Sequence, residues 1–349
     1  MSDPVVVFDA DFLGRARTGD ETYTENLLRE LARLDHGLRL VAITRRPDLV
    51  PTGIEPLRLD SESQSARMAW LLPRVLRRVR PALAHFQHVV PPLFRGRSVV
   101  TVHVLSFERD PRLLGLRDRV LFRTFVPPSA RRAARVLAVS ERTKRDVLEI
   151  YRVPEEKVVV TPNGVDPAFT PEGDRYDGQP YVLFVGALHA RKDPLAAVEA
   201  LALVGIDLRL LIAGPDKGAL ADLRRTARRL GIEERIELLG HVTKEELAAL
   251  YRGAACLVFP SRYEGFGLPA LEAMASGTPV VATTAGALPE IVGDAAVLVE
   301  PGNAATLASG IDRALAERDR LVPAGLERAR RYSWEETARR TLAVYRELV

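Results

Sequence analysis

Residues 261–271 read S-R-Y-E-G-F-G-L-P-A-L and are followed by Glu272, so two carboxylates flank a glycine-bearing turn. The preceding residues 255–260, A-C-L-V-F-P, form a short apolar run that predicts a buried strand. Leu268 and Pro269 are expected to open a helix, because proline near a first helical position is a start signal. A strand, a glycine turn and a helix in this order direct free backbone N–H groups at an anion.

The two acids of this segment narrow the kind of ligand that it suits. Glu264 and Glu272 would repel a bare phosphate, whereas a carboxylate accepts hydroxyl protons well. A ligand that has both phosphate and hydroxyl groups fits both features. The segment therefore suggests a nucleotide sugar.

Strand and helix patterns alternate along the chain in two series, which predicts an α/β fold with two Rossmann-like parallel-sheet domains in tandem. In the first series, strands are expected at residues 4–8, 38–43, 82–86, 99–102, 136–139 and 157–161, and helices near 21–34, 65–79, 116–134 and 141–151. In the second, strands are expected at residues 181–185, 208–213, 235–239, 255–260, 279–283 and 296–300, with helices between them. Ligands of such sheets bind beyond the carboxyl ends of the strands, so we expect the site in the cleft between the domains.

Length and charge agree with this division. A chain of 349 residues fits two domains of ordinary size. Residues 1–168 contain 28 Lys and Arg against 21 Asp and Glu, a net charge of +7, and the remainder has a net charge of −3. A basic first half suggests an acidic partner, although an arginine-rich surface without a partner explains the numbers equally well.

Cysteine content and hydropathy indicate the cellular compartment. The single cysteine, Cys256, lies in a predicted buried strand, which favours the role of a small apolar side chain and excludes a disulfide framework. The sequence shows no leader-like segment and no apolar run of about 18 residues. We therefore expect a cytoplasmic protein, or one attached to a membrane from the cytoplasmic side.

A basic pair follows the first strand of the second series. The segment G-A-L-H-A-R-K-D-P begins at Gly186, which lets the backbone approach a ligand closely. The Arg191 guanidinium and the Lys192 ammonium would together neutralise a diphosphate. A basic pair on a loop is by default a solvated pair. Its position at the carboxyl end of a strand, in the domain that also holds Glu264 and Glu272, makes it a functional candidate.

Residues 139–147, V-S-E-R-T-K-R-D-V, and residues 158–166, V-V-V-T-P-N-G-V-D, complete a set of ordered motifs. Together with the segments that begin at Gly186 and Glu264, they make the chain resemble the retaining glycosyltransferases of family 4, which have the GT-B fold. Residues 9–28, which read D-A-D-F-L-G-R-A-R-T-G-D-E-T-Y-T-E-N-L-L, resemble a subgroup that contains bacterial mannosyltransferases.

The resemblance implies a donor site in the second domain. Arg191 and Lys192 would bind the donor diphosphate. Glu272 would accept the ribose hydroxyls, and Glu264 would accept a hydroxyl of the transferred sugar. Both glutamates then bind the donor, so neither acts as a nucleophile, and the leaving diphosphate itself assists as the base.

The resemblance also implies several backbone contacts and two contributions from the first domain. His241 and Val242, in the segment G-H-V-T, would hold the base. Gly19 would approach the diphosphate, and His103 would lie beside the donor sugar. Three backbone N–H groups would face the sugar and the phosphate, those of Phe266, Gly267 and Leu268.

The implied domains are an acceptor domain at residues 1–168, a donor domain at residues 169–332 and a final helix, residues 333–349, that packs back on the first domain. The implied partners are a GDP- or UDP-sugar, with mannose as the sugar, and a glycan or lipid-linked acceptor. No cofactor, no metal and no nucleic acid is expected.

Two positions depart from the family pattern. Many relatives read His-Asp where this chain has His103 and Val104, and a lone histidine after a strand is by default structural. Asp20 and Glu21 follow Gly19 where relatives are often less acidic. These acids would by default stabilise a helix N-terminus, and the alternative is that they bind acceptor hydroxyls.

Two further segments have alternative explanations. Asp9 and Asp11 form a D-x-D, which binds a metal in other glycosyltransferases, yet their position at the end of the first strand favours a structural or acceptor-side role. Residues 67–80 have the composition of an interfacial helix for anionic lipid, and a core-facing helix with a solvated arginine face is the default.

Three other functions remain to be weighed. A sugar-nucleotide epimerase on a double-Rossmann plan is disfavoured by the combination of Glu264 and Glu272 with Arg191 and Lys192. A non-enzymatic protein that binds membranes or nucleic acid is weakened by an aromatic content of only 6%. A dinucleotide oxidoreductase is disfavoured because no G-x-G-x-x-G follows the first strand.

Overall fold

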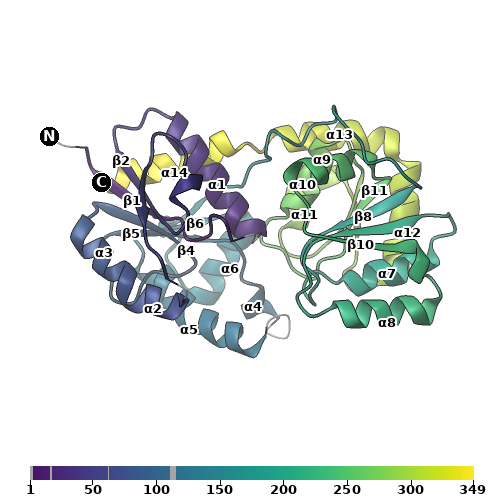
Figure 1. The fold of residues 1–349 in the computed structure, drawn as a ribbon, viewed down its shortest axis with the longest axis horizontal. Coiled ribbons are helices and arrows are strands. Elements are labelled where there is room, and N and C mark those ends of the chain that lie inside the picture. Colours follow the sequence, from purple (N-terminus) through teal and green to yellow (C-terminus); the bar gives the residue numbers. More distant parts are fainter. Residues whose placement is uncertain (1–2, 16–17, 62, 111–114) are drawn as a thin grey trace. The chain divides into compact units, whose positions relative to one another are not determined.

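The computed structural model describes residues 3–15, 18–61, 63–110 and 115–349. The chain divides into two compact units (Figure 1). Unit 1 consists of Met1–Gly164 and Ser333–Val349, and unit 2 is Val165–Tyr332. Each unit is built on a parallel sheet, so the predicted α/β class with two Rossmann-like domains is confirmed.

The sheet of unit 1 has seven strands, β1 Val5–Asp9, β2 Arg39–Thr44, β3 Glu55–Arg58, β4 Leu83–Gln87, β5 Ser98–Val102, β6 Arg135–Ala138 and β7 Val158–Val160. Their order is β3-β2-β1-β4-β5-β6-β7, and all pairs are parallel. Strand β1 pairs with β2 on one side and with β4 on the other, so the strand order reverses between β1 and β4. Such a reversal is the topological switch point at which α/β sheets bind ligands.

The helices of unit 1 are α1 Thr18–Arg33, α2 Gln64–Ala66, α3 Leu72–Val79, α4 Ser106–Arg109, α5 Leu116–Arg132, α6 Glu141–Tyr151 and α14 Trp334–Leu348. Apolar side chains of α3, α5 and α6 share one core with the strands, to which Leu76, Val126 and Val100 belong. Helices α1 and α14 contact each other on the face of the sheet opposite that core (Figure 1). The sheet is therefore covered on both sides, which explains its buried strands.

The predicted helix at residues 65–79 is confirmed, and it contains a π-helical turn that the sequence did not predict. A π-helical turn, Arg67–Leu71, separates α2 from α3. Pro73 lies in the first turn of α3 and has no N–H group for an i→i−4 hydrogen bond. The side chain of Arg67, at the start of this segment, is fully buried. Trp70 and the four arginines that follow in this segment are exposed.

The sheet of unit 2 has six strands, β8 Tyr181–Val185, β9 Arg209–Ala213, β10 Ile236–Gly240, β11 Cys256–Phe259, β12 Val280–Thr283 and β13 Val297–Val299. All six were expected from their apolar runs. Their order is β10-β9-β8-β11-β12-β13, the order of a dinucleotide-binding Rossmann sheet. The switch point of this sheet lies between β8 and β11.

The helices of unit 2 are α7 Pro194–Leu203, α8 Leu220–Leu230, α9 Lys244–Gly253, α10 Leu268–Ala275, α11 Leu288–Val292, α12 Ala304–Ala316 and α13 Arg318–Arg330. Side chains of α7, α8 and α12 share one apolar core with the strands, for example Val198, Leu223 and Ile311. Figure 1 shows α9 and α10 on the opposite side of this sheet from α7 and α8. Unit 2 is therefore also a three-layer α/β domain.

The stretch of residues 163–180, which we expected to be a linker, lacks helices and strands but is not free. From Val165 onward it packs on unit 2. Lys244 Nζ lies 2.8 Å from an Asp166 carboxylate oxygen, and the Tyr176 N–H donates to the Ala249 carbonyl at 3.0 Å. Polar contacts with α9 thus hold the stretch against the second unit.

Candidate functional site

The candidate site of unit 2 lies where two loops leave the sheet at its switch point. The loop after β8 contains Arg191 and Lys192, and the loop after β11 contains Glu264. Arg191 Nη1 donates to Glu264 Oε2 at 2.9 Å, and Lys192 Nζ donates to Glu264 Oε1 at 2.6 Å. The structure therefore brings the predicted basic pair and the first predicted glutamate into one ion cluster.

The electrostatics of this cluster follow from burial and pairing. Burial alone would raise the pKa of the Glu264 carboxyl, but Arg191 and Lys192 outweigh it and hold that pKa at about 2. Burial lowers the pKa of Lys192, and Glu264 opposes this change. Glu264 is therefore ionised at neutral pH. Two cations against one carboxylate leave a net positive charge that suits an anion.

The backbone of Glu264 is held as tightly as its side chain. Arg191 Nη1 also donates to the Tyr263 carbonyl at 2.9 Å, and the Ala287 N–H donates to the Glu264 carbonyl at 2.9 Å. Gly286, with φ of 64°, makes this approach possible, because a Cβ there would lie 2.2 Å from the Glu264 carbonyl oxygen. Any larger residue at this position would displace Glu264.

The glycine turn before α10 has the geometry that the sequence predicted. Gly267 precedes the helix with φ of 113°, and α10 begins at Leu268 with Pro269 in its first turn. No side chain caps this N-terminus, so its backbone N–H groups suit an anion. Phe266 is buried, and its ring lies edge-on to Tyr332 at 5.7 Å between centroids.

The second glutamate differs electrostatically from the first. Glu272 lies in α10, is buried, and accepts a hydrogen bond of 3.0 Å from the Tyr251 hydroxyl. Burial raises the pKa of Glu272 to about 7, and Asp166 adds to the rise while the Tyr251 hydrogen bond and Lys244 oppose it. Glu264 is thus always ionised near neutral pH, whereas Glu272 titrates there.

Three other predicted residues of unit 2 lie along the same edge of the sheet. Gly186 follows β8 with φ of 143°, and a Cβ there would approach Lys192 Cε to 3.4 Å. His241 and Val242 follow β10, immediately before the Thr243–Glu246 capping box that starts α9. Strand β9 separates β10 from β8. The predicted contact of His241 and Val242 with the base stays a prediction.

His103, the predicted catalytic residue of unit 1, follows β5 at the carboxyl end of the sheet. Its Nε2 lies 2.9 Å from Gln87 Oε1, and the Gln87 amide donates to Thr24 Oγ1 at 2.6 Å. Thr24 Oγ1 in turn donates to the Asp20 carbonyl at 2.7 Å. This chain of donors leaves Gln87 Oε1 as an acceptor and places the proton of His103 on Nε2. Burial lowers the pKa of His103 to about 4, so the ring is neutral at pH 7.

Gly19 lies in the first turn of α1, which corrects the prediction of a loop there. Helix α1 begins at Thr18, three residues earlier than expected, and Asp20 and Glu21 lie in its first turn, where carboxylates are favourable. A Cβ at Gly19 would meet no atom within 4 Å. Residues 16–17 of the predicted loop lie outside the described residues. The predicted roles of Gly19 and His103 beside the donor stay predictions.

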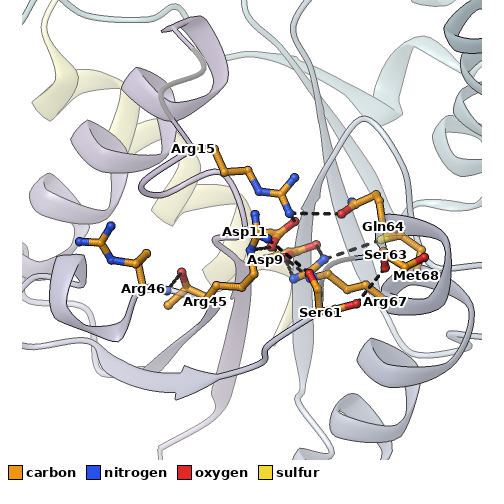
Figure 2. A network of polar contacts seen from close by, with 11 residues as sticks. Asp9, Asp11, Arg15, Arg45, Arg46, Ser61, Ser63, Gln64, Arg67 and Met68 are labelled. Atoms are coloured by element: carbon orange, nitrogen blue, oxygen red, sulfur yellow. Dashed lines mark hydrogen bonds and ion pairs between the residues drawn. The ribbon is translucent and has the colours of Figure 1, made fainter.

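Asp9 and Asp11 form a buried ion cluster with arginines, shown in Figure 2. Arg67 donates to both oxygens of Asp9, and one of these bonds measures 3.1 Å. Asp11 lies 2.5 Å from Arg15 and 3.4 Å from Arg45. Since guanidinium groups already surround both carboxylates, the D-x-D is suited to a structural role rather than to a metal.

Comparison with known proteins identifies the family. The profile for "Glycosyl transferases group 1" matches residues 166–339, and that for "Glycosyltransferase Family 4" matches residues 17–169. O-antigen chain mannosyltransferase B of Escherichia coli is 30% identical over 330 residues, which cover 89% of this chain and 84% of that protein. The chain belongs to glycosyltransferase family 4. It is therefore a glycosyltransferase.

Other relatives of this glycosyltransferase match a shorter part. The MMP alpha-(1->4)-mannosyltransferase of Mycolicibacterium hassiacum is 35% identical over 240 residues, 63% of this chain and 56% of that protein. Among solved structures, sucrose-phosphate synthase from Thermosynechococcus elongatus matches with a TM-score of 0.81 at 23% identity, covering 99% of each chain. Anabaena HepE in complex with UDP and glucose matches with a TM-score of 0.77 at 16% identity, covering 99% of this chain and 100% of that chain. These structures confirm the GT-B fold.

Several residues that support the site of this glycosyltransferase escaped the sequence reasoning. Tyr251, the partner of Glu272, precedes it by 21 residues on another helix. Gly286 lies beside the Glu264 backbone, and the only sequence signal for this contact was that the residue is a glycine. Gln87 ends β4, and only its place at a strand's carboxyl end could have indicated a contact with His103.

Proposed function

We propose that this glycosyltransferase moves mannose from a nucleotide-diphosphate donor to a glycan or lipid-linked acceptor with retention of configuration. The observation that carries the proposal is the buried cluster of Arg191, Lys192 and Glu264 at the switch point of unit 2. A diphosphate supplies the negative charge that this cluster can take up. Sugar hydroxyls supply protons that Glu264 can accept.

The chemistry assigned to the site is mainly charge stabilisation and positioning. Arg191 and Lys192 stabilise the negative charge that grows on the leaving diphosphate as the glycosidic bond breaks. The leaving diphosphate takes the acceptor proton on the same face, because both glutamates are bound to donor hydroxyls. Glu272, beside Tyr251, accepts the ribose hydroxyls.

The choice of mannose and of a nucleotide donor rests on what other proteins do. Two relatives are named mannosyltransferases, from Escherichia coli and Mycolicibacterium hassiacum. Anabaena HepE, which shares the fold, was solved with UDP-glucose. The two names support mannose as the sugar and the complex supports a nucleotide sugar as the donor, so we test GDP-mannose first and UDP-glucose second.

The product configuration tests the proposal directly. Wild-type protein is incubated with GDP-α-mannose and methyl α-mannoside, and the new anomeric signal is read by NMR. An α-linked product supports retention. A β-linked product would contradict the retaining mechanism but not the transfer, and free mannose alone would show that the acceptor is a different compound.

We also propose that one face of unit 1 contacts anionic lipid, which would bring the enzyme to a lipid-linked acceptor. In the described part of the chain, no helix has the length and apolar character that a membrane crossing requires. Helix α5, however, exposes four large apolar side chains, and Trp70 is exposed in the neighbouring π-helical turn. Helices α3 and α5 cover the same face of the sheet. The four side chains are Leu116, Val120, Leu121 and Phe125.

Vesicle sedimentation tests this second proposal. The protein should bind phosphatidylglycerol vesicles at low salt and not phosphatidylcholine vesicles, and Val120→Ser should weaken binding. Leu203→Ser, at an exposed apolar position of α7 in unit 2, is the matched control. Equal binding to both lipids, or equal loss in both variants, would contradict a specific lipid-binding face on unit 1.

A further inference from the structure

His88 is a buried histidine in an unusual backbone conformation next to β4. It follows Gln87 with φ of 59°, and the Val89 N–H donates to the Gln87 carbonyl at 2.7 Å across it. This is a γ-turn of the rare, strained kind. Non-glycine residues persist in such conformations where the surrounding structure imposes them, and functional sites are enriched in them.

The imidazole of His88 has unused hydrogen-bonding capacity. Its Nδ1 is buried and has no hydrogen-bond partner among the residues that the structure describes. Its Nε2 lies 3.9 Å from Asp20 Oδ1, which is beyond hydrogen-bond distance. A buried N–H without an acceptor is rarer than a buried acceptor without a donor, so the proton belongs on Nε2, on the side of Asp20.

Asp20 and His88 lie at the place where the topology of α/β sheets puts ligands. Asp20 lies in the first turn of α1, which follows β1, and His88 follows β4. The two side chains therefore meet across the switch point of the first sheet. His103 lies beside them, with Nε2 4.0 Å from the same Asp20 oxygen.

Two histidines and a carboxylate also suggest a metal, but their geometry and protons disagree with one. A tetrahedral zinc ion holds its ligand atoms about 3.4 Å apart. Here the Nε2 atoms of His88 and His103 lie 3.9 and 4.0 Å from Asp20 Oδ1. A histidine that binds a metal donates its other N–H to an acceptor, and Nδ1 of His88 has none in the described structure. Nε2 of His103 is already bonded to Gln87.

We propose that Asp20 and His88 form a subsite for a single sugar hydroxyl of the substrate, beside His103. The hydroxyl donates its proton to Asp20 and accepts the Nε2–H of His88. Two atoms 3.9 Å apart both reach an oxygen at about 2.8 Å when it lies to one side of the line between them. The subsite rests on the proposed function, because it binds a hydroxyl of that donor or of that acceptor.

Two variants and a matched control test the subsite. Asp20→Asn removes the anionic acceptor, and His88→Asn removes the ring while asparagine tolerates positive φ. Glu21→Gln is the control, because it removes the same charge from the same helical turn, where Glu21 accepts the Gly14 N–H at 2.6 Å. Thermal unfolding verifies that all three variants fold. Calorimetry then gives dissociation constants for GDP-mannose and for GDP, with UDP-glucose and UDP as the second pair.

The two possible sources of the hydroxyl give different results. If it belongs to the donor sugar, both variants bind the nucleotide sugar about tenfold more weakly than wild type and bind the nucleotide diphosphate equally well. If it belongs to the acceptor, donor affinity is unchanged and the KM for methyl α-mannoside rises about tenfold.

Other results would overturn the subsite. They are unchanged constants in both variants, an equal loss in Glu21→Gln, or a stoichiometric zinc ion in the wild type that the variants lose. A wild type that binds no nucleotide sugar would overturn the proposed function and the subsite together. A wild type that binds one, with both variants unaffected, would overturn the subsite alone.

Discussion

The two units place polar side chains at the same point of similar sheets, yet the chemistry differs. At the β8–β11 switch point of unit 2, two buried cations surround Glu264. At the β1–β4 switch point of unit 1, the imidazoles of His103 and His88 lie beside Asp20. The common strand order places these side chains at the switch point of each sheet, and the residues that follow the strands decide the charge there. Two cations surround the carboxylate at the switch point of unit 2, whereas two imidazoles lie beside the carboxylate at that of unit 1.

The largest effect is expected from removing a cation from the cluster of unit 2. Lys192→Ala removes one of the two cations that we propose to stabilise the leaving diphosphate, so turnover should fall about 10²–10³-fold. Arg262→Ala is the control, because Arg262 pairs with Asp193 at 2.8 Å and stays half-exposed. Steady-state rates and urea unfolding curves are measured for both. Near-normal transfer by Lys192→Ala would contradict the role assigned to it.

Glycine substitutions compare the two units directly. Gly286→Ala places a Cβ 2.2 Å from the Glu264 carbonyl oxygen at positive φ, so it should destabilise unit 2 by about 3 kcal/mol. Gly19→Ala meets no atom and should leave stability unchanged. If Gly19 approaches the diphosphate as predicted, this stable variant will still bind GDP more weakly. Unchanged GDP affinity would refute the prediction for Gly19.

Sequence reasoning reached more of unit 2 than of unit 1. Continuous apolar runs predicted all six strands of the second sheet, and proline and glycine predicted the start of α10 at Leu268. Strand β3, Glu55–Arg58, was missed because it is a short edge strand with a proline and mostly exposed side chains. The burial of Arg67 was missed because it depends on Asp9, which is distant in the sequence.

The candidate site divides in the same way. Arg191, Lys192 and Glu264 were expected to lie close together because carboxyl ends of parallel strands share one edge of a sheet. The contacts of Tyr251 with Glu272 and of Gln87 with His103 were not foreseen. Each depends on how a helix or strand is rotated within the folded unit, which no local spacing reveals.

The titration of Glu272 in unit 2 predicts that stability depends on pH. Its pKa of about 7 in the folded state exceeds that of an unfolded glutamate, so the folded state binds the extra proton. Stability should therefore fall by about 2 kcal/mol as pH rises from 5 to 7, and Glu272→Gln should remove this dependence. Urea unfolding at several pH values measures it. An equally steep fall in Glu272→Gln would assign it to another group.

The smallest expected effect concerns metals. Both carboxylates of the D-x-D are surrounded by arginines, and the Asp20, His88 and His103 group lacks the proton arrangement of a metal site. Transfer should therefore be unchanged after dialysis against EDTA. A loss of activity that Mg²⁺, Mn²⁺ or Zn²⁺ restores would contradict this prediction and would make these residues candidate metal ligands.

The most direct test of the central claim is thermal unfolding in the presence of GDP, UDP, GDP-mannose and UDP-glucose. A ligand at 100 times its dissociation constant adds about 2.7 kcal/mol to the stability of the folded state. Wild type should be stabilised by one nucleoside diphosphate and by the corresponding nucleotide sugar. Lys192→Ala should lose most of that stabilisation at the same ligand concentration. No stabilisation of wild type by any of the four, or equal stabilisation of both proteins, would contradict the assignment of the Arg191, Lys192 and Glu264 cluster to a nucleotide-sugar donor.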